Sequence, residues 1–92
     1  MSNWNDVKKN ITAISPEEWD EIELKVKIVG EISEARKKAG ITQTELENLT
    51  GIKQTFIARF ENNRMDPQLT TVLKLLRPLG LTLDVVPLNS RQ

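Results

Sequence analysis

The sequence predicts a mainly all-α protein: a small helical bundle, preceded by a helical extension and followed by one short strand. The first observation is the helical spacing of apolar residues along most of the chain, interrupted at glycine and proline. The second is a set of helix-start signals at residues 15–18, 42–45 and 66–67. The third is that residues 81–86, LTLDVV, form the only segment with the alternation and β-branched residues of a strand.

The longest predicted helix begins at Pro16 and runs to about Lys38, where Gly40 ends it. Ser15 is the expected N-cap, Pro16 takes the first helical position and Glu18 completes a capping box. Apolar residues fall on two stripes of this helix, which implies burial on more than one side. The first stripe contains Trp19, Ile22, Val26, Val29 and Ile32, and the second contains Leu24, Ile28 and Ala35.

Residues 42–64 predict two short helices joined by a tight turn. Thr42 and Glu45 have the spacing of a capping box at the start of the first helix. Leu46 and Leu49 are expected to supply its apolar face. Gly51 follows at the point where the chain turns, because glycine accepts a positive φ angle at little steric cost.

The second helix of this pair separates its apolar and polar side chains. Phe56, Ile57 and Phe60 lie on the side that is expected to be buried. The other side carries amide, hydroxyl and cationic groups, from Lys53, Gln54, Thr55 and Arg59. A helix packed in this way can enter a major groove and read base edges. The alternative is a pair of ordinary helices with solvated polar faces.

A further helix and the strand complete the predicted chain. Asp66 is the expected N-cap and Pro67 the first residue of a helix that ends at Pro78 and Gly80, with Leu69, Val72, Leu73 and Leu76 turned inward. A single strand cannot satisfy its own backbone groups. The simplest partner is the same strand of a second copy, which makes Leu81, Leu83, Val85 and Val86 candidate dimerisation residues. The alternative is an unpaired C-terminal tail.

Composition excludes several classes of function. The chain has 92 residues and contains neither cysteine nor histidine, so thiol catalysis, histidine general bases and the commonest metal ligands are absent. We expect no enzyme activity, no cofactor and no metal. No apolar run reaches the roughly 18 residues of a membrane span, and the N-terminus does not resemble a signal peptide, which predicts a soluble cytoplasmic protein.

Charge is distributed unevenly although the net charge is zero. Residues 1–35 contain eight acidic residues and four lysines, a balance of −4, whereas residues 36–65 contain six basic and three acidic residues, a balance of +3. The basic part coincides with the two-helix motif, as contact with phosphates requires. The acidic part suits a basic partner, or is simply a solvated helix face.

The order T-Q-x-x-L-x-x-x-x-G-I-x-x-x-x-I-x-x-x-E-N, which starts at Thr42, resembles the Xre/Cro-type helix-turn-helix family of phage repressors. The resemblance covers roughly residues 31–83 and implies a lambda-repressor-like helical bundle that binds double-stranded DNA. Two positions depart from the family pattern: Glu47 replaces a usual small alanine, and Lys53 replaces a usual serine or threonine cap.

We expect the DNA-binding residues to have separable roles. Gln54 and Thr55 should reach base edges, and Arg59 a base or a phosphate. Phosphates should be positioned by Gln43, Lys53, Asn62, Asn63 and Arg64. The operator should be a palindrome with half-sites about one helical turn apart.

Residues 80–87, GLTLDVVP, resemble the final strand of HigA-type antitoxins. That resemblance implies a dimer that represses its own operon and binds a small, basic, RelE-like ribonuclease toxin. The expected organisation is an extension at 1–27, a DNA-binding domain at 28–80 and a dimerisation strand and tail at 81–92. The expected toxin-binding residues are Trp4, Val7, Ile11, Trp19 and Glu23.

Three alternatives remain open at this point. Trp4 and Trp19 could pack on each other and cap the domain core instead of binding a toxin. The chain could be a phage-type repressor that has no toxin partner. It could also be a protein-interaction module that no longer reads DNA, for which Glu47 is the supporting residue.

Overall fold

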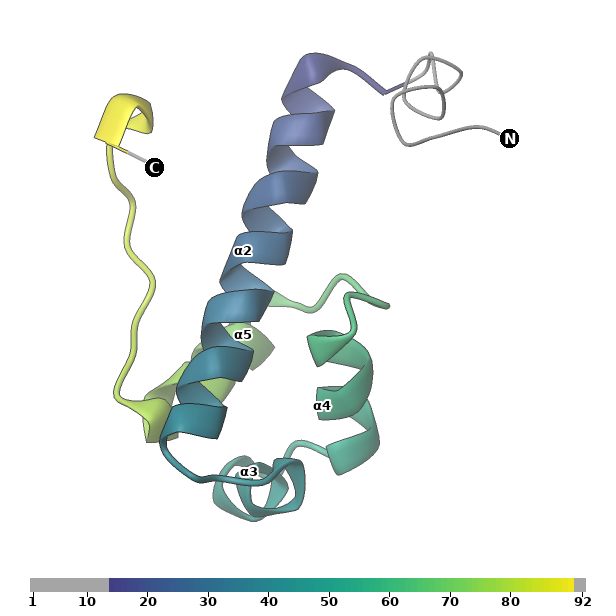
Figure 1. Cartoon of the computed structure of the whole chain (residues 1–92), viewed down its shortest axis with the longest axis vertical. Helices are drawn as coiled ribbons and strands as arrows, with labels where there is room; N and C mark the ends of the chain where they lie inside the picture. The colour runs from purple at the N-terminus through teal and green to yellow at the C-terminus, as the bar shows by residue number, and fades with distance from the viewer. Residues whose placement is uncertain (1–13, 91–92) are drawn as a thin grey trace.

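The structure is a computed structural model that describes residues 14–90. Within this range the chain forms four α-helices and two 3₁₀ turns, and the helices confirm the mainly α-helical prediction (Figure 1). The α-helices are α2 (Pro16–Lys38), α3 (Gln43–Thr50), α4 (Gln54–Glu61) and α5 (Leu69–Leu76). The 3₁₀ turns are η1 (Arg77–Leu79) and η2 (Leu88–Ser90).

Helix α2 begins and ends where its capping signals predict. The Ser15 side chain accepts a hydrogen bond from the Glu18 backbone N–H at 3.2 Å, and Pro16 occupies the first turn. Only this half of the predicted capping box forms, since the Glu18 side chain does not accept from the Ser15 N–H. Three basic residues lie in the last turn, where the helix dipole favours positive charge. The C-terminal half of α2 packs against the other helices, while its N-terminal half extends beyond them (Figure 1). No helix among residues 14–90 is long and apolar enough to cross a membrane.

The two-helix motif also forms as predicted. Thr42 and Glu45 make a complete capping box, with both hydrogen bonds 3.0 Å long. Gly51 ends α3 in the left-handed conformation, with a φ angle of 79°. A side chain at this φ would be strained, so glycine allows α4 to start only a few residues after α3 ends.

The core gathers apolar side chains from all four helices. Its buried members are Val29, Ile32, Leu46, Ile57, Phe60, Val72, Leu75 and Leu76. The prediction that Leu49 lies inward is wrong, because this side chain is 60% exposed on the outer side of α3. The predicted inward face of α5 is also wrong in part: Leu69 and Leu73 are exposed, and the fully buried residue is Leu75.

The start of α5 also differs from the prediction. Asp66 is not its N-cap, since the helix begins at Leu69 and its N-cap, Gln68, makes no side-chain capping bond. The Asp66 carboxylate instead accepts from the Lys25 ammonium at 3.2 Å. An ionic partner on α2 therefore replaces the local cap that the sequence predicts.

The predicted strand over residues 81–86 is absent from the described chain. Residues 81–87 form neither helix nor strand, and they run back along α2 toward its N-terminus (Figure 1). Leu81, Thr82 and Leu83 border the same hollow as Ile28 and Ile32, and Leu88 lies beside Pro16 and Asp20. A strand requires a second strand to pair with, and an α-helix has already used its backbone groups internally.

Candidate nucleic-acid interface

Helix α4 presents a polar face next to a buried one. Ile57 and Phe60 are each 1% exposed and anchor the helix in the core. At about 100° per residue, Gln54, Thr55 and Arg59 fall on a different side of the helix from this pair. Thr55 and Arg59 are exposed and Gln54 is half-buried. The arrangement is that of a helix held by one face with the other free for a ligand.

A buried ion pair ties the C-terminal end of α4 to α2. The Arg36 Nε donates to Glu61 Oε2 at 2.7 Å, and its Nη2 donates to Oε1 at 2.9 Å. The two side chains are only 10% and 8% exposed. The Arg36 Nη1 also donates to the Ile41 carbonyl at 2.7 Å, which fixes the turn between α2 and α3. The pair is thus bidentate and joins three parts of the fold.

The protonation of this pair follows from its contacts. Burial by itself raises the pKa of Glu61, but hydrogen bonds from Arg36, Gln43 and Ser33, together with the Arg36 charge, outweigh it and hold the pKa below its ordinary value. The hydrogen bond to Glu61 is the main reason that the pKa of Arg36 is raised. Both groups are therefore charged in the folded protein at neutral pH.

Glu61 also orients two glutamines through a relay of hydrogen bonds. Gln43 Nε2 donates to Glu61 Oε1 at 3.0 Å, and Gln54 Nε2 donates to Gln43 Oε1 at 2.7 Å. An ionised carboxylate only accepts hydrogen bonds, so Gln43 must turn its NH₂ group toward Glu61 and its oxygen toward Gln54. Gln54 must then turn its own NH₂ group toward Gln43. The charge of one buried carboxylate thereby sets the orientation of both amides.

Glu47 supplies the N-terminal cap of α4 from a different helix. The N-cap residue Lys53 makes no side-chain capping bond. The Glu47 Oε1, on α3, accepts from the Gln54 backbone N–H at 2.8 Å instead. A carboxylate at a helix N-terminus satisfies an unpaired N–H and favours the helix dipole. The two departures from the family pattern, at Glu47 and Lys53, are therefore structurally connected.

The remaining predicted DNA-binding residues lie on exposed positions around α4. Lys53 and Arg64 flank its two ends and are exposed. The Asn62 side chain donates to the Ala58 carbonyl at 2.8 Å and so caps the end of α4. Asn63 adopts a positive φ of 58°, which turns the chain toward α5. Their roles toward DNA stay predictions.

The predicted toxin-binding residues are only partly described. Trp4, Val7 and Ile11 lie outside the described residues. Trp19 is half-buried and Glu23 is exposed, both in the first two turns of α2. Of the predicted dimerisation residues, Leu81, Leu83, Val85 and Val86 are all exposed, and Val85 is 96% exposed.

Sequence reasoning missed the roles of Arg36, Glu61 and Glu47. The sequence does contain a signal for the role of Arg36, because this residue continues the apolar stripe of Val29 and Ile32 at helical spacing. A charged residue on a core-facing stripe requires a buried partner of opposite charge. No comparable local pattern indicates the contact between Glu47 and Gln54, which depends on how α3 packs against α4.

The Glu47 cap can be tested by stability measurements. Glu47→Ala should lower the free energy of unfolding by about 0.5–2 kcal/mol, since it leaves the Gln54 N–H without a partner. Adding Lys53→Ser should restore most of this loss by supplying a local cap, and Glu47→Gln, which keeps an acceptor oxygen, should cost less than Glu47→Ala. Urea unfolding of the four proteins measures the effect. Equal losses in Glu47→Ala with and without Lys53→Ser would contradict the assignment.

The Glu61 carboxylate should make stability depend on acid pH. Because its pKa is lower in the folded than in the unfolded protein, its contribution is complete above the unfolded value of about 4.3 and is lost as the pH falls through the folded value. Glu61→Gln should be less stable at neutral pH and should lose less stability on acidification. Glu31→Gln, at an exposed acid away from the network, is the control. If the free energy of unfolding of Glu61→Gln and of the wild type changed in parallel with pH, the proposed contribution of Glu61 would be refuted.

Comparisons with known proteins agree with this geometry. A helix-turn-helix family model matches residues 32–86. The chain is 47% identical, over 96% of its length and 88% of the relative's, to an uncharacterized helix-turn-helix-type transcriptional regulator of Haemophilus influenzae. It is 44% identical to antitoxin HipB of Escherichia coli K12 over 54% of this chain and 57% of HipB.

Among solved structures, the chain is similar to a toxin–antitoxin module from Streptococcus pneumoniae. The TM-score is 0.68 and the sequence identity 48%, with 96% of each chain covered. The family model covers more than half of this chain, and the regulator of Haemophilus influenzae aligns with nearly all of it. The chain therefore belongs to the Xre-type helix-turn-helix family of DNA-binding regulators.

Proposed function

We propose that the chain is the antitoxin of a type II toxin–antitoxin pair and represses its own operon as a sequence-specific DNA-binding dimer. The observation that carries the DNA-binding part is the relay from Glu61 through Gln43 to Gln54, at the exposed start of α4. The antitoxin part is supported by the likeness to HipB and to a chain of a toxin–antitoxin module. The toxin is proposed to be a small, basic, RelE-like ribonuclease.

Gln54 is proposed to read an adenine. Its Nε2 gives one hydrogen to Gln43, which leaves a second N–H and the side-chain oxygen for a ligand. An N–H donor next to a carbonyl acceptor matches adenine N7 and N6 in the major groove. Because Gln43 holds the amide, little side-chain entropy remains to be lost on binding. Thr55, exposed on the same helix, would contact a neighbouring base.

Phosphate contacts are proposed for the polar residues that surround Gln54 and Thr55. Lys53 at the start of α4 and Arg64 beyond its end are exposed cations on either side of the proposed base-contacting residues Gln54 and Thr55. Gln43, Asn62 and Asn63 carry the remaining polar groups there. Such contacts fix the position of the protein on the duplex without reading sequence. Arg59 lies one turn after Thr55 and would reach a base or a phosphate.

A dimer is proposed through residues 81–86. Among described residues, Leu81 makes the only backbone–backbone bond of this segment, to the Leu76 carbonyl. Its apolar side chains are exposed. The Val85 N–H donates to the Asp84 carboxylate and the Leu83 carbonyl accepts from the Thr82 hydroxyl. On dimerisation these local bonds would give way to a ladder with the same segment of a second copy. The operator would then be a palindrome with half-sites about one helical turn apart.

Base and phosphate contacts should separate in binding measurements. Gln54→Ala and Thr55→Ala should weaken binding to DNA from upstream of the gene by about 1–3 kcal/mol and change binding to random DNA little. Lys53→Ala and Arg64→Ala should weaken both and lower the salt slope by about one. Lys74→Ala, at an exposed cation on α5, is the matched control. Fluorescence anisotropy measures all of these, and equal wild-type affinity for both DNAs would refute sequence-specific reading.

The dimer can be tested by removing ladder donors. Leu83→Pro combined with Val85→Pro should convert a dimer to a monomer, because proline has no backbone N–H. Leu83→Val combined with Val85→Ile keeps every donor and should stay dimeric. Light scattering gives the molar mass of each protein. A dimer that survives both prolines would show that these residues are not the interface.

A further inference from the structure

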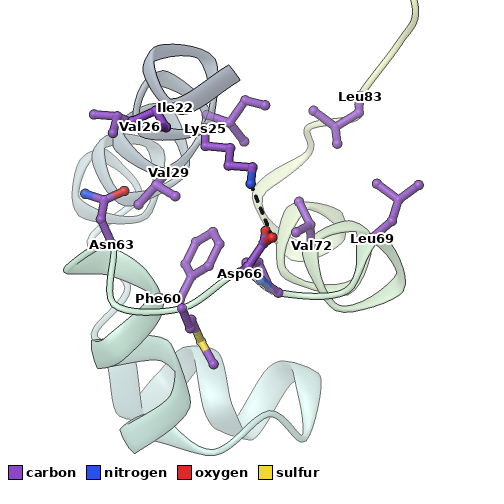
Figure 2. A pocket seen from close by; sticks show the side chains of 13 residues that line it. Ile22, Lys25, Val26, Val29, Phe60, Asn63, Asp66, Leu69, Val72 and Leu83 are labelled. Carbon is purple, nitrogen blue, oxygen red and sulfur yellow. Dashed lines mark hydrogen bonds and ion pairs between the residues drawn. The ribbon is translucent and has the colours of Figure 1, made fainter. Parts of the chain in front are cut away.

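A groove with an apolar floor lies between the first half of α2 and the start of α5, away from the start of α4 (Figure 2). Its floor is formed by buried core residues, Val29, Phe60 and Val72. Its rim is formed by Ile22, Val26 and Leu69, which are 40%, 48% and 64% exposed, and by Leu83 of the C-terminal segment, which is 36% exposed (Figure 2). Single exposed apolar residues are ordinary, but here they gather around one hollow, as at binding surfaces.

The surroundings of the groove are acidic. Glu18 lies one turn before Ile22 on the same face of α2, and Glu21 and Glu23 lie about 100° to either side of Ile22. All three are exposed. The groove is lined by one basic residue, Lys25, and its ammonium is paired with the Asp66 carboxylate across the opening (Figure 2). Both of these side chains are more than half exposed, so their bridge adds little stability and can rearrange.

The acidic surroundings of the groove favour some binding partners over others. DNA would meet acidic side chains and an apolar floor, and is disfavoured. A second copy that contributed its own α2 would place like charges together. Residues 81–86 of a second copy carry Asp84 and no cation, so they offer no charge complement. A basic protein with exposed apolar side chains fits the groove best. Its apolar side chains would contact the floor and rim, and its positive charge would accelerate association with the acidic turns of α2.

The position of the groove leaves the DNA-reading residues uncovered. It borders Phe60 and Asn63, at the C-terminal end of α4, whereas Gln54 and Thr55 lie at the other end. The eight residues of α4 separate the two ends by about 10 Å. Side chains inserted in the groove would therefore contact the segment that leads to Arg64 and would not contact the Gln54 amide.

We propose that this groove is the docking site of a basic protein partner, which inserts apolar side chains between α2 and α5 and meets the acidic first turns of α2. The proposal rests on the proposed antitoxin function for the class of partner, a small basic toxin. It extends that function by adding anchoring positions beyond the predicted residue Trp19, namely Ile22 and Val26 on α2 and Leu69 on α5.

The test uses the full chain and the protein encoded by the reading frame next to its gene. Val26→Gln and Leu69→Gln should each weaken binding at least tenfold, measured by calorimetry. Leu49→Gln is the matched control, since Leu49 is 60% exposed on α3 and outside the groove. Glu18→Lys should weaken binding more at low salt than at high salt, while Glu31→Lys, on the opposite side of α2, should not. Each variant should still bind DNA, which confirms that it is folded.

The outcomes separate the two proposals. If the wild-type chain does not bind the neighbouring protein, the antitoxin function fails and the groove loses its proposed occupant. If the wild type binds and the two groove variants bind equally well, the groove proposal fails while the antitoxin function stands. If light scattering shows that the groove variants split a dimer, the occupant is a second copy. If they unfold more easily than Leu49→Gln with unchanged partner binding, the chain itself fills the groove.

Discussion

The buried ion pair between Arg36 and Glu61 is the interaction on which the rest of the structure depends. It connects α2 to the end of α4 and, through the Ile41 carbonyl, to the turn before α3. Removing two charges from water costs several kcal/mol per ion in the absence of compensation. Here the bidentate geometry and the hydrogen bonds from Gln43 and Ser33 supply that compensation. No buried side-chain polar atom among the described residues lacks a partner.

Such a pair is weak evidence for stability, because apolar residues of similar volume often stabilise a protein as well or better. Apolar residues, however, cannot accept hydrogen bonds and so cannot orient a neighbouring amide group. A carboxylate that only accepts hydrogen bonds forces the Gln43 amide into one orientation, and Gln43 in turn forces that of Gln54. We therefore interpret the pair as a device that prepares the proposed base-reading residue, with Glu47 holding the backbone of the same residue.

The sequence predicts best those features that are encoded locally. The Thr42–Glu45 capping box, the Gly51 turn and both ends of α2 depend on residues within a few positions of one another, and all are confirmed. Features that depend on distant contacts were missed or misassigned. Asp66 pairs with Lys25 across the fold instead of capping α5. Leu49 points outward, which leaves Leu46 as the only buried residue of α3. The strand at 81–86 requires a partner that a single chain does not provide. The candidate site shows the same division. The polar face of α4 can be predicted from the spacing of its residues, whereas the hydrogen-bond relay from Glu61 to Gln54 depends on how α3 packs against α4.

The most direct test of this account is a double-mutant cycle between the ion pair and Gln54. The discrimination between operator and random DNA would be measured for the wild type, Gln54→Ala, Arg36→Met with Glu61→Leu, and all three changes together, after circular dichroism has confirmed that each is folded. If the pair orients Gln54, then Gln54→Ala lowers discrimination by about tenfold in the wild type and by less than about twofold in the apolar background, since contacting residues are not additive. The same loss in both backgrounds would contradict the account.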